Sequence, residues 1–368
     1  MKILVINWRD IKNPLAGGAE VYFQEIFKRI AGAGHTVHLL CVKFPDAPES
    51  EIIDNIQINR IGGANTFNFA VYRQLKDIVE KENYDIVIDD LNKIPFFSPW
   101  LIKKPVLVMM MHLFRASIFK EVFLPFGLYV YLMESLIPLC YKNQPFVALS
   151  ESSKKDLLRF GIDGSKIVVI PPGTDTKKFH PDFSQKGEKL IVHVGRLKRY
   201  KSTDHLLLAT KLLLKKRKDF KVMILGDGDD LPRLKELNKK LGLDAIVKFT
   251  GYVPEQEKVL VYQRAALLVE NSVKEGWGLI VMEANACGTP VVASRVPGLL
   301  DSVIENKTGL FYEYGNIQEL AEKIERLLDD EELRLAMGRN GIEWANQLTW
   351  DKTADMMLAT IQSALGNK

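Results

Sequence analysis

Residues 275–294 read EGWGLIVMEANACGTPVVAS and combine a glycine-rich turn, a predicted helix start and a short apolar run. Gly276 and Gly278 expose backbone where the helix begins, so unpaired N–H groups and the helix dipole point toward a ligand beside Glu275. Such a helix start suits a phosphate group. Glu283 follows eight positions later, and at 3.6 residues per turn both carboxylates can border one cleft without touching. Two carboxylates beside a phosphate site indicate a nucleotide sugar as the ligand.

Short apolar runs alternate with helical patterns along the chain, which is typical of parallel α/β sheets. The predicted strands of a first series are residues 2–7, 37–42, 85–88, 106–111, 146–149 and 167–170. Those of a second series are residues 190–194, 222–225, 247–249, 267–270 and 291–293. Pro171, Pro172 and Gly173 lie between the two series and suit a hinge, because prolines stiffen the chain and glycine lets it turn. We therefore place a domain boundary after residue 172.

The composition of the 368-residue chain limits the classes of partner. A formal charge of +4 and a pI near 8.7 favour anionic ligands but are too weak to imply nucleic acid. Cys41, Cys140 and Cys287 have no metal-ligand spacing, so we expect buried thiols in a reducing compartment. The first predicted strand begins at Lys2, with no basic segment or cleavage site before it. We expect a cytoplasmic protein.

Arg196 and Lys201 follow the end of the predicted strand at residues 190–194. Breaking a sugar–diphosphate bond develops negative charge on the leaving phosphate, so a catalyst needs fixed cations there. Arginine offers a planar fork for two phosphate oxygens, and lysine supplies a mobile point charge. Open α/β sheets bind ligands at this end of their strands. The alternative is surface charge in a basic loop that also contains Lys198 and Arg199.

Five motifs occur in a defined order: GGAE at 17–20, VGRLKRYKS at 194–202, LGDG at 225–228, FTGYV at 249–253, and the stretch at 275–294. Together they resemble the family-4 retaining glycosyltransferases over nearly the whole chain. The resemblance implies the α/β fold called GT-B, in which two Rossmann-like domains face one cleft. It implies an acceptor-side domain at residues 1–172 and a domain at residues 173–349 that binds a nucleotide-sugar donor. A C-terminal helix at residues 350–368 would pack back on the first domain.

The resemblance also assigns roles to individual residues. It implies that Arg196 and Lys201 hold the donor diphosphate, that Glu275 contacts the donor sugar and that Glu283 holds the ribose. His112 would contact the donor sugar, although MHLF at 111–114 departs from the family's His-x-His-Gly pattern. The other implied donor contacts are Gly17, Gly18, Val253, Gly276, Gly278 and Leu279.

Each of these residues also has a structural interpretation. Glu275 could be a helix-start carboxylate that the dipole stabilises, and Glu283 could be a solvated helix position. The Gly17–Gly18 pair could form an ordinary turn, and His112 could be a structural histidine.

Two further carboxylate pairs were considered as ligand sites. Asp227 and Asp229 have the D-x-D spacing that binds a divalent metal in another glycosyltransferase fold, but here a turn after a strand explains them. The same glycine-rich stretch lacks the third glycine of a dinucleotide fingerprint, which argues against a nicotinamide dehydrogenase. We expect no metal and no cofactor, with a UDP- or GDP-sugar as the donor. Asp89 and Asp90, with Asn92, follow a predicted strand and are candidates for the acceptor side.

Residues 122–141 form an apolar stretch in which Glu134 is the only charged residue. The stretch is nearly long enough to span a bilayer, but Pro125, Gly127 and Pro138 interrupt it. The favoured interpretation is a helix buried in the first domain. The alternative is a surface-lying helix that makes peripheral contact with the cytoplasmic face of a membrane.

We predict a metal-independent, retaining hexosyltransferase that uses a nucleotide sugar and a glycan or lipid-linked acceptor, with acceptor residues unknown. A sugar-nucleotide epimerase or hydrolase on the same fold is one alternative, with Glu275 and Glu283 in acid–base roles. A non-catalytic subunit that binds a sugar nucleotide or a lipid is the other.

Overall fold

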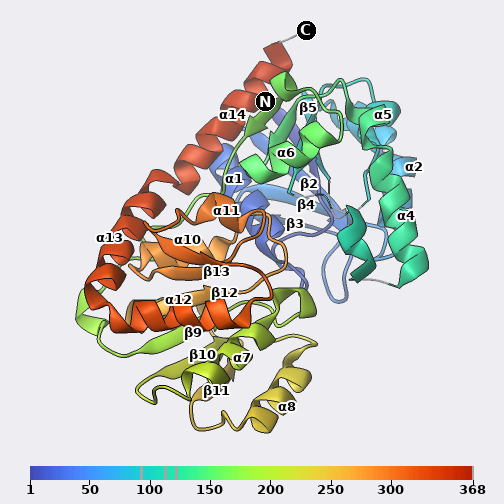
Figure 1. The fold of residues 1–368 in the computed structure, drawn as a ribbon. Coiled ribbons are helices and arrows are strands. Elements are labelled where there is room, and N and C mark those ends of the chain that lie inside the picture. The colour runs from blue at the N-terminus through green and yellow to red at the C-terminus, as the bar shows by residue number, and fades with distance from the viewer. Residues whose placement is uncertain (92–93, 112, 114, 121–122, 367–368) are drawn as a thin grey trace. The chain divides into compact units, whose positions relative to one another are not determined.

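The computed structural model describes residues 1–91, 94–111, 113, 115–120 and 123–366. The chain forms two compact units, one of Met1–Pro172 with Trp350–Lys368 and one of Gly173–Thr349 (Figure 1). These bounds are the same as those expected for the two domains from the sequence. Each unit contains one largely parallel sheet whose strands are joined by helices, so the predicted α/β class is confirmed.

The sheet of unit 1 has the strand order β3-β4-β2-β1-β5-β6-β7-β8, and every pair is parallel except β3 with β4. Apolar runs explain its central strands, because β1 and β6 are buried over nearly their whole length. The strands are β1 (Lys2–Ile6), β2 (Thr36–Val42), β3 (Ser50–Ile53), β4 (Ile56–Ile61), β5 (Ile86–Leu91), β6 (Val106–Met110), β7 (Phe146–Ala148) and β8 (Ile167–Val169).

The helices of unit 1 include a C-terminal one that returns from the far end of the chain. Helix α14 packs beside α1, where the Trp350 ring meets Tyr22 edge to face and Asp351 pairs with Arg29 (Figure 1). The α-helices are α1 (Gly18–Gly32), α2 (Phe67–Glu82), α3 (Ser98–Leu101), α4 (Leu124–Ser135), α5 (Ile137–Tyr141), α6 (Glu151–Arg159) and α14 (Trp350–Gly366). The 3₁₀ segments are η1 (Arg115–Lys120) and η2 (Gly164–Lys166).

Unit 2 has a fully parallel sheet with the order β11-β10-β9-β12-β13-β14. Its strands are β9 (Leu190–Val194), β10 (Lys221–Leu225), β11 (Val247–Gly251), β12 (Leu267–Glu270), β13 (Val291–Ser294) and β14 (Gly309–Tyr312). Its α-helices are α7 (Thr203–Leu213), α8 (Leu231–Leu241), α9 (Glu255–Arg264), α10 (Leu279–Ala286), α11 (Leu299–Ser302), α12 (Ile317–Asp329) and α13 (Glu331–Gln347). The 3₁₀ segments are η3 (Phe183–Gln185) and η4 (Arg199–Lys201).

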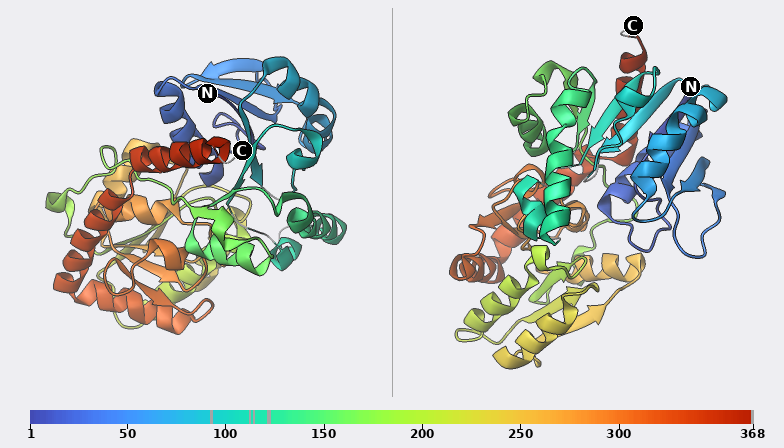
Figure 2. Two further views of the ribbon diagram at one scale, coloured as in Figure 1. Left: turned by 90° about the horizontal axis from the view of Figure 1, so that it is seen from above. Right: turned by 90° about the vertical axis from the view of Figure 1, so that its right-hand side faces the viewer.

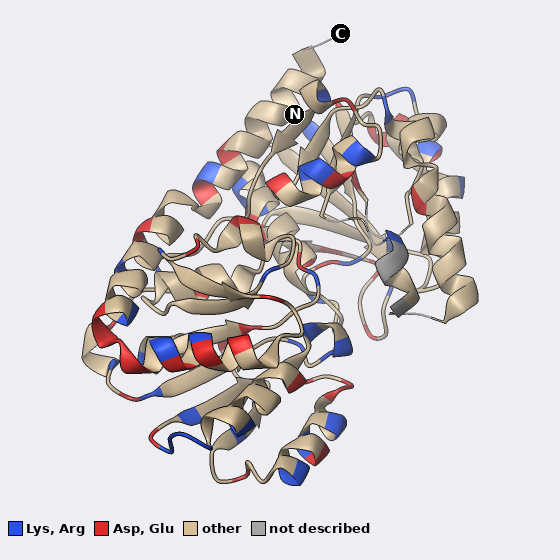
Figure 3. Ribbon diagram, in the orientation of Figure 1, with Lys and Arg blue, Asp and Glu red and all other residues tan. Residues whose placement is uncertain are grey.

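Helix α12 shows how sequence specifies packing in unit 2. The Asn316 side chain caps it by accepting a hydrogen bond from the Glu319 N–H at 3.2 Å. Leu320, Ile324 and Leu327 recur at helical spacing and are buried in the core of the unit. The opposite side carries alternating acids and bases, as Figure 3 shows along this helix.

Three strands of the structure are absent from the sequence prediction. β3 and β4 form a hairpin around Asp54 and Asn55, both of which have positive φ. In β4 buried and half-buried residues alternate, so it lacks the continuous apolar run by which the other strands were recognised. β14 is fully buried but only four residues long.

The prediction that Asp89 and Asp90 follow a strand is wrong. Both lie inside β5 and are fully buried, because the strand continues to Leu91. The Asp89 carboxylate accepts hydrogen bonds from Ser98 Oγ at 2.5 Å and from Tyr141 Oη at 2.7 Å. Asp89 therefore stabilises the packing of α3 and α5 on the sheet and does not line a ligand site. Asn92 lies outside the described residues.

From the buried carboxylate of Asp89 we predict that the stability of the fold depends on pH. Burial raises the pKa of Asp89 to about 6, above its value in the unfolded chain, despite the hydrogen bonds from Ser98 and Tyr141. The stabilising contribution is therefore complete below about pH 4 and is lost as the pH rises through about 6. Relative to Asp89→Asn, the parent should lose about 3 kcal/mol of unfolding free energy across this range. Urea denaturation of both proteins at several pH values measures the difference; parallel pH profiles would contradict it.

The interpretation of residues 122–141 as a buried helix is also wrong. The described part forms α4 and α5, joined at Leu136, and most of the large apolar side chains of α4 are exposed. Leu124–Tyr141 is the one segment among the described residues whose length and composition would permit it to cross a membrane. Figures 1 and 2 show α4, in teal, at the outer edge of unit 1.

Candidate functional site

The carboxyl ends of the unit 2 strands carry most of the predicted ligand residues. β9, β10, β11 and β12 are parallel, so the segments that follow them leave from one edge of the sheet. Ligands of open α/β sheets bind at this edge. The predicted residues that follow these four strands are Arg196, Lys201, Val253, Glu275, Gly276, Gly278 and Leu279.

Two glycine-rich turns at this edge are pressed against each other. A Cβ atom on Gly226 would lie 1.9 Å from the Gly195 carbonyl oxygen, and one on Gly228 would lie 2.2 Å from that of Leu197. The Leu197 N–H donates to the Asp227 carbonyl at 2.8 Å. The motifs at 194–202 and 225–228 therefore require glycine for backbone contact. Asp227 lies in the loop after β10, and Asp229 lies in a turn, as predicted, where it pairs with Lys198 at 2.6 Å.

Lys201 ends the 3₁₀ segment η4 and points its ammonium group at two carboxylates. Its Nζ lies 2.5 Å from Glu275 Oε1 and 3.8 Å from Glu270 Oε1, and its side chain is only 12% exposed. Burial alone would lower the pKa of the Lys201 ammonium, but the charges of Glu270 and Glu275 outweigh burial and raise that pKa above its usual value. Lys201 is therefore a fixed cation at this edge.

Ser272 links the two carboxylates. Its hydroxyl lies 2.7 Å from Glu275 Oε1 and also within hydrogen-bond distance of Glu270 Oε1. One hydroxyl proton can be donated to only one of them at a time. Glu270 ends β12 and is fully buried. The cluster of Lys201, Glu270, Ser272 and Glu275 thus combines one cation with two carboxylates, and we call it the lysine–glutamate cluster.

The start of α10 lies directly after this cluster in the chain. Gly278 caps the helix with φ of 90°, a conformation that side chains other than glycine rarely adopt. A Cβ atom on Gly298 would lie 2.2 Å from the Glu275 carbonyl oxygen, so the loop after β13 packs closely on the Glu275 turn. The N-cap residue Gly278 contributes no side-chain hydrogen bond to the first turn of α10. Anion binding at the N–H groups of this turn stays a prediction from the sequence.

Glu283 lies in the second turn of α10 and faces α9. Its Oε2 accepts a hydrogen bond from Tyr262 Oη at 3.1 Å and pairs with Lys258 Nζ at 2.9 Å. Burial raises the pKa of the Glu283 carboxyl, although Lys258 and Tyr262 act in the opposite direction. The solvated-position interpretation is thus wrong, because only 17% of the side chain is exposed.

The remaining predicted residues of unit 2 lie on the surface of the same edge. Arg196 is exposed and follows β9, whereas Lys201 is half-buried. Val253 follows β11, and the hydrogen bond from the Gly226 N–H to the Gly251 carbonyl at 2.8 Å holds its segment beside the Gly226 turn. Arg196 and Lys201 thus differ in exposure, and only Lys201 belongs to the lysine–glutamate cluster.

The predicted glycine pair belongs to unit 1. Gly17 caps α1 and Gly18 begins it, at the carboxyl edge of the unit 1 sheet. The Gly17 N–H donates to Glu20 Oε2 at 2.6 Å, so a buried carboxylate already satisfies this amide. His112 lies outside the described residues.

The thiols of unit 1 and unit 2 are unreactive. Cys41, Cys140 and Cys287 are free and buried, as predicted. Burial raises the pKa of the Cys140 and Cys287 thiols to about 12, which leaves both inert as nucleophiles. Among the residues that the structure describes, no three or more His, Cys, Asp or Glu side chains could hold a metal ion together.

Family profiles match nearly the whole chain. Residues 16–178 match the family described as Glycosyltransferase Family 4, and residues 175–344 match Glycosyl transferases group 1. The chain belongs to the group 1 glycosyltransferases. The second match contains the lysine–glutamate cluster and all of α10, so the site described above lies in the part that this chain shares with its family.

A curated relative agrees with this assignment. A D-inositol 3-phosphate glycosyltransferase from Corynebacterium aurimucosum is 32% identical over 222 residues, which are 55% of this chain and 53% of the relative. The match thus spans about half the length of such curated relatives.

Two solved structures resemble the fold of this chain over nearly its full length. Sucrose-phosphate synthase from Thermosynechococcus elongatus has a TM-score of 0.84 at 22% identity and 100% coverage of both chains. Anabaena HepE in complex with UDP-glucose has a TM-score of 0.78 at 19% identity, covering 99% of this chain and 100% of the other. The predicted GT-B fold is confirmed.

Four residues of the site carry no predicted role. Glu270 could have been found, because a carboxylate that ends a short apolar strand lies at the ligand edge of a parallel sheet. Ser272 lies in the same turn. Lys258 and Tyr262 gave no such signal, since their position opposite Glu283 depends on how α9 packs on α10.

Proposed function

We propose that this glycosyltransferase moves a hexosyl unit from a UDP- or GDP-sugar to a glycan or lipid-linked acceptor, with retention of anomeric configuration. The observation that carries the proposal is the lysine–glutamate cluster beside the start of α10, where the N-cap is Gly278. There a fixed cation and the N-terminal end of the helix dipole suit the diphosphate, and a carboxylate suits the sugar.

The proposed roles divide the donor among the residues of unit 2. Lys201 and Arg196 stabilise the charge that develops on the leaving diphosphate, and the α10 start adds its dipole. Glu275 accepts hydrogen bonds from the sugar hydroxyls. Glu283 holds the ribose through its carboxylate, which Lys258 and Tyr262 orient. Gly276, Gly278, Leu279 and Val253 supply backbone contacts to the donor, and Gly17, Gly18 and His112 keep the donor contacts that the family resemblance implies.

The names of similar proteins support the proposed substrates. HepE was solved with UDP-glucose, which favours a uridine donor. The Corynebacterium relative is named for a phosphorylated polyol acceptor, D-inositol 3-phosphate. Retention is proposed from the family resemblance, and a cytoplasmic location from the sequence. Metal independence is proposed because Lys201, Arg196 and the α10 start together supply positive potential for the diphosphate.

A thermal-shift screen of nucleotide sugars, followed by transfer assays, tests this function. A true donor at 100 times its Kd should stabilise the folded state by about 2.7 kcal/mol. Transfer with that donor should survive EDTA, whereas full loss of activity restored by manganese or magnesium would disprove metal independence. Release of free sugar without an acceptor would favour the hydrolase, and donor binding without any turnover would favour the non-catalytic subunit.

A further inference from the structure

Helix α4 differs from an ordinary surface helix, because its one charged residue faces the protein and most of its large apolar residues face outward. The side that faces the protein contains Gly127, Val130 and Glu134, and the Glu134 carboxylate accepts the Arg115 N–H at 2.7 Å. Gly127 lets the Phe119 ring approach, since a Cβ atom there would lie 2.8 Å from that ring. The only charged residue of α4 is thus turned inward, and its outer side is left to large apolar residues.

The outer side of α4 and α5 forms what we call the apolar surface. Phe123, just before α4, is 74% exposed, and the helix ribbon in Figure 3 is uncharged except at one acidic position. Water-soluble proteins rarely leave so many large apolar side chains together in solvent. The apolar surface consists of Phe123, Leu124, Phe126, Leu128, Tyr129, Leu132 and Leu139.

The packing of α5 in the core of unit 1 indicates that the α4–α5 segment can lie on a membrane but cannot cross it. Ile137, Cys140 and Tyr141 belong to the hydrophobic core of unit 1, and the Tyr141 hydroxyl is bonded to Asp89. Extraction of these side chains would dismantle that core. A break at Leu136 and the prolines at 125 and 138 also prevent one straight spanning helix. The segment is therefore suited to an interface, with one side in lipid and one side in protein.

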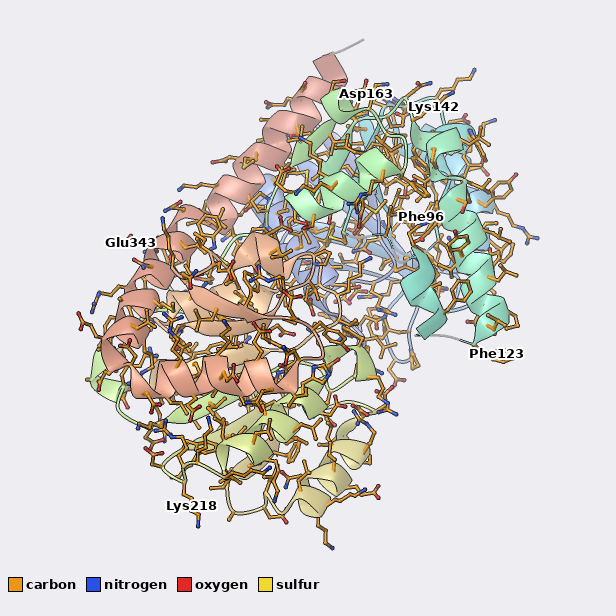
Figure 4. All side chains as sticks on the ribbon, in the orientation of Figure 1. Phe96, Phe123, Lys142, Asp163, Lys218 and Glu343 are labelled. Atoms are coloured by element: carbon orange, nitrogen blue, oxygen red, sulfur yellow. The ribbon has the colours of Figure 1, made fainter. Side chains whose placement is uncertain are left out.

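The charges beside the apolar surface indicate which kind of membrane it fits. Lys142 follows α5 and Lys103 follows α3, a helix in contact with α5, and both lysines are exposed. Figure 4 shows Phe123 and Lys142 at opposite ends of the α4–α5 segment. From 123 to 142 the only acid is Glu134, which is buried. Cations without exposed acids favour anionic headgroups.

The segment that contains α4 and α5 connects β6 to β7, and it begins at the carboxyl edge of the unit 1 sheet. It leaves the carboxyl end of β6 and returns to the amino end of β7, a neighbouring parallel strand. Gly17 and Gly18 follow β1 at the same carboxyl edge of this sheet. The Phe123 end of the apolar surface is thus on the side where an acceptor would be bound.

We propose that the apolar surface docks the protein on an anionic membrane, from which it takes a lipid-linked acceptor. The inference rests on the proposed glycosyl transfer for its purpose, but membrane binding is measurable without any transfer. The lipid chain would stay in the bilayer while its sugar or phosphate headgroup reaches the carboxyl edge of unit 1.

Co-sedimentation with liposomes tests the docking. The parent should pellet with vesicles that contain phosphatidylglycerol, and less with pure phosphatidylcholine. Phe126→Ser and Leu132→Ser each remove one inserted side chain, so each should lower the partition coefficient about tenfold. Lys142→Gln should lower binding only to the anionic vesicles.

Two matched controls lie elsewhere on the surface. Ile52→Ser on β3 and Leu260→Ser on α9 replace residues that are 69% and 56% exposed, and both should leave binding unchanged. Circular dichroism and the thermal shift with a nucleoside diphosphate should be unaltered in all variants, which separates lost docking from lost folding or lost donor binding.

The outcomes that overturn the proposal are distinct from those that overturn the function. A parent that stays in the supernatant with anionic vesicles, or α4 variants that bind as the parent does, would disprove docking. A concentration-dependent dimer in sedimentation velocity, dissociated by Phe126→Ser, would assign the apolar surface to a second copy instead. Absence of transfer to any acceptor would disprove only the proposed function.

Discussion

Replacement of Lys201 by alanine is expected to lower the turnover of sugar transfer about 10- to 1000-fold, more than it lowers donor affinity. The ammonium lies 2.5 Å from Glu275 and 3.8 Å from Glu270, so its positive charge offsets the charge of these two carboxylates. Without it, their negative potential would oppose the charge that grows on the leaving diphosphate. Steady-state kinetics with a labelled donor measure kcat and KM separately.

A neighbouring lysine provides the matched control for Lys201→Ala. Lys198 lies in the same loop but pairs with Asp229 at the exposed surface, where an ion pair contributes about 0–1 kcal/mol. Lys198→Ala should therefore leave turnover and unfolding free energy nearly unchanged. Lys201→Ala should also destabilise unit 2 by about 3–5 kcal/mol, since it removes the cation 3.8 Å from the fully buried Glu270 carboxylate. Adding Glu275→Gln should recover part of that stability but not turnover. Unchanged turnover in Lys201→Ala would remove the residue from the active site.

Glu275→Gln is expected to reduce transfer about 100-fold while leaving the affinity for free nucleoside diphosphate within about twofold. The substitution preserves shape but weakens acceptance of hydrogen bonds from the sugar hydroxyls, which free nucleotide lacks. The amide oxygen can still accept from Ser272 and Lys201, so the loop should keep its conformation. Calorimetric titration with nucleoside diphosphate and a transfer assay give the two quantities.

Glu283→Ala is the companion variant, because ribose is present in both the donor and the free nucleotide. It should weaken binding of both by a similar factor. If Glu283→Ala impaired only transfer and Glu275→Gln impaired both, the two assignments would be exchanged. Normal binding and activity in both variants would make the pair structural.

Strands were predictable from the sequence where burial is complete. β9 and β12 begin and end at the predicted residues, because every position in them is buried and the apolar run has the length of the strand. β4 was missed because Gln57, Asn59 and Arg60 interrupt its isoleucines. Arg60 is buried all the same, since it pairs with Asp10 at 2.8 Å. A contact between two residues that are fifty positions apart in the sequence leaves no local pattern.

The site was predictable as a set of positions but not as a set of contacts. Spacing placed Glu275 before α10 and Glu283 within it, as the structure has them. The pairing of Lys201 with Glu275 joins strand ends 74 positions apart, and Glu270 enters it only because β9 and β12 are neighbours in the sheet. The sequence therefore suggested Arg196 and Lys201 as two cations for the diphosphate. In the structure, Lys201 also pairs with the carboxylates of Glu270 and Glu275.

The composition of residues 122–141 could not decide their environment. A helix rich in Phe, Leu and Tyr suits both a protein core and a lipid interface. The difference lies in which side carries Glu134, and that depends on Arg115 in the preceding segment. Only the tertiary structure shows that the charge is inside.

Helix α14 makes unit 1 discontinuous, since residues 173–349 lie between its two parts. On the ribosome, unit 2 emerges as one uninterrupted segment and can complete its fold first. Unit 1 must wait for residues 350–366, because the α1 surface stays uncovered until helix α14, with Trp350, Met357 and Ile361, has been synthesised. The usual order of N-terminal domain first is thereby reversed. A nascent chain arrested after residue 349 should therefore present a protease-resistant unit 2 joined to an incomplete, protease-sensitive N-terminal half.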